Sequence, residues 1–386
     1  MAASTTTTTA EGPQMNFSVD RDTILAEVSV VARACDSKTT QPILTHLLID
    51  ASASGTITIG GSDHSRTLRS ECTAQVASAG SVAIPAQKFL SYLKLLPSGP
   101  VHLEGLANHH IQIQAGKSWT RMTGRSASEF PNLPSVPANS IELSARVLRT
   151  LVRQSVFAVA TSDDRYLLKA ALLLLRPDRA GMVATDGHRL SFVVVPDDSI
   201  PVQGTRKSLL PRECLTDLLA LLSVAKEETV SFGEDDTTLF FRMGTRLLTA
   251  RKLSGTFPNY EAILPKGMST TTVVRSAELM SSVQRVLEFS DERSKKVTLE
   301  LADNALRIRS SSPDRGESEE ILDVSYAAKP VTIGFNGTYL VEFLRTIGEK
   351  GSMRFSFKDS TSAGVLIPEV MSGEYQQQYV LMPMRV

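Results

Sequence analysis

The chain has 386 residues, more than one hydrophobic core usually holds, which favours two or three domains. Lys plus Arg and Asp plus Glu both number 41, so the net charge of zero excludes a protein drawn to nucleic acid by its overall charge. Three widely spaced cysteines, Cys35, Cys72 and Cys214, match neither a disulfide framework nor a zinc site. They indicate a reducing cytoplasm.

The first fourteen residues are expected to form a disordered tail. This segment, residues 1–14, contains the run Thr5–Thr9 and lacks the apolar stretch of a signal peptide. Further along, the apolar run Ala170–Leu175 is ended by Arg176, well short of the ~18 residues of a membrane span. We therefore expect no membrane-spanning segment.

Two kinds of predicted helix recur along the chain. Apolar residues at i, i+4 and i+7 predict amphipathic helices. The first set starts at Ile24, Leu148 and Leu279, at intervals of 148 − 24 = 124 and 279 − 148 = 131 residues. The first trios are Ile24, Val28 and Val31; Leu148, Val152 and Ser155; and Leu279, Val283 and Val286. The second trios are Phe89, Leu93 and Leu96; Leu215, Leu219 and Leu222; and Leu340, Leu344 and Ile347.

Short alternating or apolar segments between these helices predict strands. They are Ile43–Ile49, Gly55–Ile59, Leu167–Leu175, Val183–Thr185 and Leu306–Ile308. Phe130-Pro131-Asn132-Leu133 returns as Phe257-Pro258-Asn259-Tyr260 after 257 − 130 = 127 residues, and both precede proline-bearing linkers. The pattern predicts an α+β protein of three similar domains, each itself a doubled motif. Their expected bounds are 15–137, 138–265 and 266–386.

A carboxylate, an imidazole and a hydroxyl lie close together at Asp186, His188 and Ser191. A catalytic triad usually draws its members from separate elements, so we expect no catalysis from one short turn. Ser62-Asp63-His64 lies 186 − 63 = 123 residues earlier, which favours a repeated turn closed by the aspartate. The sequence has no Gly-x-x-x-x-Gly-Lys phosphate loop, and its histidines lack metal-ligand spacing. We expect no enzyme, no cofactor and no metal site.

A stripe of basic residues is predicted on one helix. Arg146, Arg149 and Arg153 fall on one face, beside the apolar stripe of Leu148 and Val152. Such a face suits phosphate contact without sequence reading. Weaker candidates are Arg33, Lys38, Lys88, Arg212 and Arg285, each of which could equally solvate a helix face.

Four segments carry local signatures of a known family. They are Thr185-Asp186-Gly187-His188-Arg189-Leu190, Phe257-Pro258-Asn259-Tyr260 with Leu264-Pro265, Glu319-Glu320-Ile321-Leu322-Asp323-Val324, and Tyr379-Val380-Leu381-Met382-Pro383-Met384-Arg385. On these segments, residues 15–386 resemble the bacterial beta clamps, the beta subunits of DNA polymerase III.

The resemblance implies a DNA clamp fold: three similar domains, each with two helices backed by antiparallel sheets. Two chains would join head to tail in a ring-shaped homodimer around duplex DNA. The protein would be a non-enzymatic processivity factor in the bacterial cytoplasm that binds the replicative polymerase, the clamp loader and other proteins with a clamp-binding motif. The alternative is an interaction scaffold that shares the fold but does not encircle DNA, and the oligomeric state would separate the two.

The resemblance also implies a pocket between the second and third domains for short partner peptides. A terminal strand could equally pack against its own sheet. Ala262 replaces a long basic residue found in well-known members, and Ala363 is a second departure. The matching pocket residues are Leu168, Thr185, Gly187, His188, Arg189, Leu190, Pro258, Ile263, Ala363, Val380, Leu381, Met382, Pro383, Met384 and Arg385.

Two DNA contacts and the dimer interface follow from the same resemblance. Lys38 stands where the family often has a DNA-contacting arginine, and Ser162 stands where some members have a glutamine contact. We expect the first domain to join the third through charged groups and apolar anchors. The candidates are Lys88, Lys117, Trp119 and Arg121 on one side and Phe289, Glu317, Glu319 and Glu320 on the other.

Overall fold

The computed structural model of the chain forms two compact units. Unit 1 comprises Met1–Ile141 and Ser223–Arg251, and unit 2 comprises Glu142–Leu222 and Lys252–Val386. The predicted tail 1–14 and the candidates Lys38 and Ser162 lie outside the described residues. The structure describes residues 15–35, 39–134, 136–137, 139–161, 165–265, 267–268, 270–369 and 374–385.

One element order, a strand, a helix and three strands, occurs six times in the described residues, with an extra strand, β5, in its first occurrence. The first domain has β1 (Asn16–Asp20), α1 (Arg21–Val31), β2 (His46–Ala51), β3 (Thr56–Ser62), β4 (Arg66–Thr73), β5 (Gln75–Ser78), β6 (Gly80–Pro85), α2 (Ala86–Leu95), β7 (Pro100–Gly105), β8 (His110–Ala115) and β9 (Ser118–Thr123). The second has β10 (Ile141–Ser144), α3 (Ala145–Arg153), β11 (Ala170–Arg176), β12 (Arg179–Thr185), β13 (Arg189–Pro196), β14 (Arg206–Pro211), α4 (Arg212–Val224), β15 (Thr229–Glu234), β16 (Thr238–Met243) and β17 (Arg246–Arg251). The third has β18 (Thr270–Arg275), α5 (Ser276–Leu287), β19 (Lys296–Ala302), β20 (Ala305–Ser312), β21 (Gly316–Asp323), β22 (Val331–Asn336), α6 (Gly337–Ile347), β23 (Ser352–Phe357), β24 (Gly364–Glu369) and β25 (Gln376–Leu381). The predicted doubled motif is therefore present in each domain.

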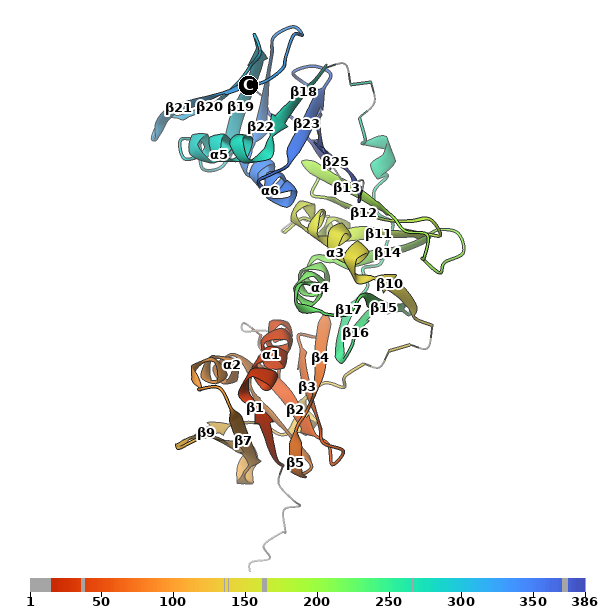
Figure 1. Ribbon diagram of the computed structural model, residues 1–386, viewed down its shortest axis with the longest axis vertical. Helices are drawn as coiled ribbons and strands as arrows, with labels where there is room; N and C mark the ends of the chain where they lie inside the picture. The colour runs from red at the N-terminus through yellow and green to blue at the C-terminus, as the bar shows by residue number, and fades with distance from the viewer. Residues whose placement is uncertain are drawn as a thin grey trace, which may run out of the picture. The chain divides into compact units, whose positions relative to one another are not determined.

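Unit 1 contains two antiparallel sheets. One has the strand order β5-β1-β7-β8-β9, and the other continues from β15-β16-β17 into β4-β3-β2-β6. The second sheet joins the first two domains, because β17 pairs with β4 with Leu248 opposite Leu68. Helices α1 and α2 lie together on one side of these strands (Figure 1).

Unit 2 repeats this plan with β14-β11-β12-β13-β25-β24-β23-β18 and β21-β20-β19-β22. The larger sheet joins the second and third domains, because β13 pairs with β25 with Leu190 opposite Val380. Helix α5 packs against α6 and against β20 and β21, while α3 packs against β12 and β13 (Figure 1). Two neighbouring domains therefore share one continuous sheet in each unit.

Side-chain caps and apolar stripes explain where the helices form. Asp20 Oδ1 accepts hydrogen bonds from the backbone N–H groups of Asp22 and Thr23 at the start of α1, and Ser144 and Asn336 cap α3 and α6 in the same way. Most of the predicted apolar trios are buried, which confirms the six helices. The half-buried members are Leu219 and Ile347, and the buried Ser155 donates its hydroxyl to Leu151 O at 2.6 Å.

Two predicted strands begin later than expected. The residues Pro42–Thr45 and Tyr166–Lys169 form 3-10 turns that precede β2 and β11. Their apolar side chains suit a strand, but only the residues that follow pair with a neighbouring strand. Apolar content alone did not distinguish a short turn from the strand beside it.

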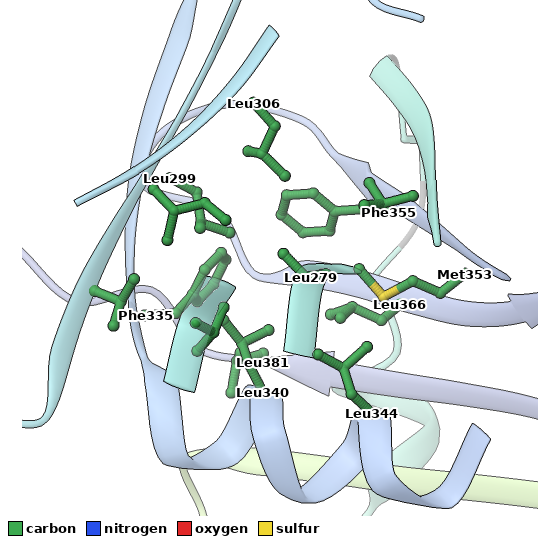
Figure 2. Close-up of a cluster of buried hydrophobic side chains, with 14 of the residues drawn as sticks. Leu279, Leu299, Leu306, Phe335, Leu340, Leu344, Met353, Phe355, Leu366 and Leu381 are labelled. Atoms are coloured by element: carbon green, nitrogen blue, oxygen red, sulfur yellow. The ribbon is translucent and has the colours of Figure 1, made fainter. Parts of the chain in front are cut away.

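The core of the third domain is formed by side chains from both of its helices and both of its sheets. Leu340 and Leu344 of α6 meet Leu279 of α5 and Phe355 of β23 (Figure 2). Each is at most 1% exposed, and burial of such a side chain contributes about 1.5–3 kcal/mol to stability. Tyr379 and Leu381 of β25 belong to the same core, which therefore fixes the C-terminal strand to the third domain.

Candidate functional site

The turn that follows β12 is closed by an aspartate. Asp186 Oδ1 accepts hydrogen bonds from the backbone N–H groups of His188 (3.0 Å) and Arg189 (3.1 Å). Thr185 Oγ1 donates to Arg189 O at 2.6 Å and accepts from the N–H of Gly187 at 3.0 Å. Gly187 has φ +87°, which a residue with a Cβ rarely adopts. The prediction that Asp186 closes a turn is confirmed.

Arg189 is buried at the centre of this region rather than exposed in a pocket. Its Nε donates to Asp186 Oδ2 at 2.9 Å, its Nη2 donates to Phe157 O at 2.6 Å, and its Nη1 donates to Glu342 Oε2. The guanidinium also lies 4.1 Å from the centre of the Tyr339 ring. Burial acts to lower the pKa of Arg189, but Tyr379, Glu342 and Asp186 outweigh it and raise the pKa. Arg189 therefore fixes the turn to α6.

The C-terminal strand is an internal member of the larger sheet of unit 2. β25 lies between β13 and β24. The N–H of Met382 donates to His188 O at 2.9 Å, and the N–H of Met384 donates to Gly334 O at 2.8 Å. The terminus thus packs against its own sheet, as the alternative interpretation expected, while Met382 remains 38% exposed beside the turn.

An apolar cluster adjoins the turn and the terminal strand. Leu190 and Val380 are buried in it, and Ile263 and Ala363 pack against it half-buried. Phe257 is buried in the cluster, whereas the predicted Pro258 is exposed. Leu190, Ile263, Ala363 and Val380 thus come from four separate segments of the chain and meet in one cluster.

The sequence prediction missed several members of the same cluster. Leu172, Leu209, Phe192, Tyr260 and Leu264 all belong to it. Alternating burial along β13 leaves Phe192 half-buried and was a usable signal. In β11 the run Ala170–Leu175 is buried throughout, so its sequence does not show which residues face the cluster. Two cavities of about 530 and 250 Å³ lie against this segment, and both include Tyr260 in their walls. Burial and the neighbouring Glu261 raise the pKa of Tyr260.

The remaining predicted pocket residues differ in exposure. Leu168 is buried in the turn before β11, and Leu381 is buried in the core of the third domain. His188 and Arg385 are exposed, and Pro383 and Met384 are half-buried. The predicted pocket residues most accessible to a partner are therefore Pro258, the turn residues Gly187 and His188, and Met382 and Arg385 in the C-terminal segment.

The basic stripe of α3 is only partly free. Arg146 and Arg153 are exposed and make no hydrogen bond or ion pair with the described residues. Arg149 instead donates from Nε (3.0 Å) and Nη2 (2.5 Å) to Leu222 O, near the C-terminal end of α4. Arg149 thus satisfies a helix carbonyl, a role that its spacing on α3 could not reveal.

The other basic candidates differ in whether their side chains are bonded within the chain. Arg212 Nη1 donates to Val156 O (3.0 Å) and Val159 O (2.6 Å), and Arg285 forms an ion pair with Glu320 at 2.5 Å. Lys88 is exposed on α2, and Arg33 is exposed in the turn after α1. Their roles in DNA contact stay predictions.

Most of the dimer candidates lie at two sheet edges, whereas Lys88 is on α2 and Phe289 follows α5. Lys117 precedes β9, which carries Trp119 and Arg121 and ends its sheet, while Glu317, Glu319 and Glu320 lie on β21, which ends another. Trp119 is 65% exposed and Ile321 of β21 is 52% exposed. Glu319 already bonds Arg307 and Arg309 within the chain, and Phe289 is 38% exposed beyond α5.

The triad candidate does not converge. Ser191 is fully buried and donates its hydroxyl to Gln154 O at 2.6 Å, while the Asp186 carboxylate is bound within its turn. Within the described stretches, no three His, Cys, Asp or Glu side chains gather in a way that could hold a metal ion. No helix in those stretches is long and apolar enough to cross a membrane.

Comparison with known proteins identifies the family. Family models of the DNA polymerase III beta subunit match residues 15–134 (N-terminal domain), 142–259 (central domain) and 261–385 (C-terminal domain). The beta sliding clamp of Vibrio cholerae is 30% identical over 375 residues, which cover 96% of this chain and 100% of that protein. That of Escherichia coli is 29% identical over 380 residues, with the same coverage.

Solved structures give the same result. A Pseudomonas aeruginosa sliding clamp bound to griselimycin has a TM-score of 0.87 at 27% identity and covers 97% of this chain and 100% of its own. A Bacillus subtilis sliding clamp has a TM-score of 0.85 at 25% identity and covers 97% and 100%. The chain belongs to the DNA polymerase III beta subunit family, the beta sliding clamps.

Proposed function

We propose that this chain, a sliding clamp and hence a non-catalytic processivity factor of DNA polymerase III, works as a ring of two copies around duplex DNA. The observation that carries the proposal concerns two of the edge strands, β9 in the first domain and β21 in the third, which carry large exposed apolar side chains. An edge strand leaves backbone N–H and C=O groups unpaired and invites another strand. One head-to-tail contact used twice closes a dimer.

The two edges have complementary side chains. Lys117 and Arg121 flank Trp119 at β9, whereas Glu317 and Glu319 lie on β21 with Ile321. Large exposed apolar side chains among charged ones are typical of interaction surfaces. We therefore pair β9 of one chain with β21 of the other, with Trp119 and Ile321 as the apolar contacts.

The dimer is tested by placing a charge at this edge. Trp119→Lys should convert the dimer to monomer, measured as molar mass by light scattering at micromolar concentration. Tyr166→Lys is the matched control, because Tyr166 is a similarly exposed aromatic residue (56%) that belongs to neither edge strand. A wild-type monomer, or a Trp119→Lys dimer, would contradict the proposed closure.

DNA contact is proposed for the exposed basic face of α3, where Arg146 and Arg153 project from a helix whose apolar side is buried. Contact with phosphates alone leaves the protein free to slide. Replacing both with Ala should reduce the log-log salt slope of DNA affinity by about 0.9 for each lost phosphate contact. An unchanged slope would remove this face from the DNA-binding surface.

The replicative polymerase, the clamp loader and other partners are proposed to bind by a short peptide at the apolar cluster around Leu190 and Val380. Met382 supplies an exposed, flexible apolar side chain at its border. Met382→Asp should weaken binding of a labelled polymerase peptide about tenfold or more, whereas Val273→Asp, at a similarly exposed position (43%), should not. Equal affinities of the two variants would place the peptide elsewhere. The work of such a protein on DNA places it in the bacterial cytoplasm.

A further inference from the structure

The turn that follows β3 repeats the turn that follows β12. Asp63 Oδ1 accepts from the backbone N–H groups of Ser65 (3.0 Å) and Arg66 (2.9 Å), as Asp186 Oδ1 does from His188 and Arg189. Arg66 Nε lies 3.1 Å from Asp63 Oδ2, the counterpart of the Arg189 to Asp186 contact at 2.9 Å. Even the positive φ recurs, at His64 (+69°) and Gly187 (+87°).

The strands beside these two turns also correspond. The N–H of Arg251 donates to Ser65 O at 2.7 Å, as the N–H of Met382 donates to His188 O at 2.9 Å. β17 places Thr249 opposite Thr67 of β4, where β25 places Val380 opposite Leu190 of β13. Unit 1 therefore contains a second copy of the framework around the proposed peptide pocket. In this copy Thr67, Thr249 and Arg251 stand where the first has Leu190, Val380 and Met382.

A cavity of about 420 Å³ lies at this second copy. Thr67 and Thr249 line it, so two hydroxyls replace the leucine and valine of the apolar cluster. Thr249 is only 3% exposed, and its hydroxyl makes no hydrogen bond with the described residues. The Thr249 hydroxyl is therefore available to donate a hydrogen bond to a ligand in the cavity.

The charge of the lining favours an anionic ligand. Two lining residues are arginines and none is acidic. Arg66 is already paired with Asp63, whereas Arg251 is exposed at the rim and forms no ion pair with the described residues. A guanidinium beside hydroxyl donors suits a carboxylate.

We propose that this cavity binds a carboxylate side chain of an extended acidic peptide, with Thr249 and Arg251 as its donors. That the ligand is a peptide rests on the proposed function, because the same framework is proposed to hold peptides at its apolar copy. The chain would then have two peptide sites with the same backbone framework, one lined by apolar side chains and the other by hydroxyl and guanidinium groups.

The test is a selection of random twelve-residue peptides displayed on phage against the intact protein, followed by anisotropy of the enriched peptides. Acidic peptides should be enriched, and Thr249→Val and Arg251→Ala should each weaken them about tenfold or more. Thr249→Val preserves the side-chain shape, and its melting temperature checks folding. Arg242→Ala is the control, because Arg242 is likewise exposed on β16, the strand next to β17. Failure to enrich acidic peptides, or equal binding by all variants, would overturn the proposal.

Two further measurements separate the possible failures. Sodium glutarate that competes as well as the peptide at equal concentration would show a small-anion site and overturn the peptide assignment. The double variant Thr67→Leu with Thr249→Val should bind a second polymerase peptide per chain by calorimetry, and no gain would refute the shared framework. A wild-type protein that binds no polymerase peptide at all would refute the apolar pocket. Binding of acidic peptides at the second cavity would still be tested separately by Thr249→Val and Arg251→Ala.

Discussion

Replacement of Arg189 by Met tests the central bonding arrangement of the partner region. Methionine keeps much of the apolar stem but removes the guanidinium that bonds Asp186, Glu342 and Phe157 O. Arg189 is 7% exposed and Asp186 is 13% exposed at the side chain, so the carboxylate left behind is largely shielded from water. Loss of one partner of a buried ion pair costs about 3–5 kcal/mol.

This magnitude converts into a measurable change in melting temperature. For a unit of roughly 150–250 residues each kcal/mol shifts the midpoint by about 2–4 °C, so Arg189→Met should lower the unfolding transition of unit 2 by roughly 6–20 °C. Calorimetry measures the midpoint of unfolding, and fluorescence anisotropy of a labelled polymerase peptide measures the affinity of the site for that peptide. Because Arg189 acts through the turn, peptide affinity should fall at temperatures where the variant is still folded.

Arg66→Met is the matched control within the same chain. Arg66 occupies the equivalent turn, where it contacts the Asp63 carboxylate and donates to Arg33 O at 3.1 Å, but its side chain is 18% exposed against 7% for Arg189. Its loss should therefore cost less than that of Arg189 and leave affinity for the polymerase peptide unchanged. Equal destabilisation by the two variants, or an unchanged affinity in Arg189→Met, would refute this reasoning.

Two predictions concern ionisable groups in unit 1. Burial acts to raise the pKa of Glu27, but the hydrogen bonds from Arg246 outweigh it and hold the pKa below the ordinary 4.5. This stability is present above pH 4.5 and is lost as the pH falls through the native pKa. Glu27→Gln should thus lower the free energy of unfolding by about 3–5 kcal/mol at pH 7. The difference from the wild type, measured by urea titration, should become progressively smaller below pH 4.5. A difference that does not change with pH would argue against the ion pair. Burial raises the pKa of Cys35 to about 12 and that of Cys72 to about 11. At pH 8 both thiols should therefore react with a disulfide reagent at least about tenfold more slowly in the native than in the unfolded chain, and comparable rates would contradict the raised pKa values.

The repeated helices and the closing turn could be predicted because their signals are local. An i, i+4, i+7 trio such as Leu279, Val283 and Val286 predicts the buried face of its own helix, and all three residues are fully buried. The spacing of Asp63 from Asp186 likewise exposed a repeated turn before any contact was known. Such features depend on neighbours in sequence, which the sequence shows directly.

The bonds that assemble the site depend on residues far apart in sequence. Arg189 meets Glu342 across 153 positions, and no local pattern distinguishes it from an exposed arginine. Arg149 has helical spacing suited to a basic stripe, yet its guanidinium bonds Leu222 O, 73 positions away. A side chain's charge is visible in sequence, whereas its partner is set by strand pairing and packing.

The most direct test of a topological clamp is its retention on circular DNA. The protein would be loaded onto a nicked circle with a bacterial clamp loader and washed in high salt, and the circle would then be cut with a restriction enzyme. Ring closure requires that the protein stay on the circle through the wash and leave once the DNA is linear. Equal loss from circular and linear DNA would contradict encirclement and leave only a scaffold with the fold of a clamp.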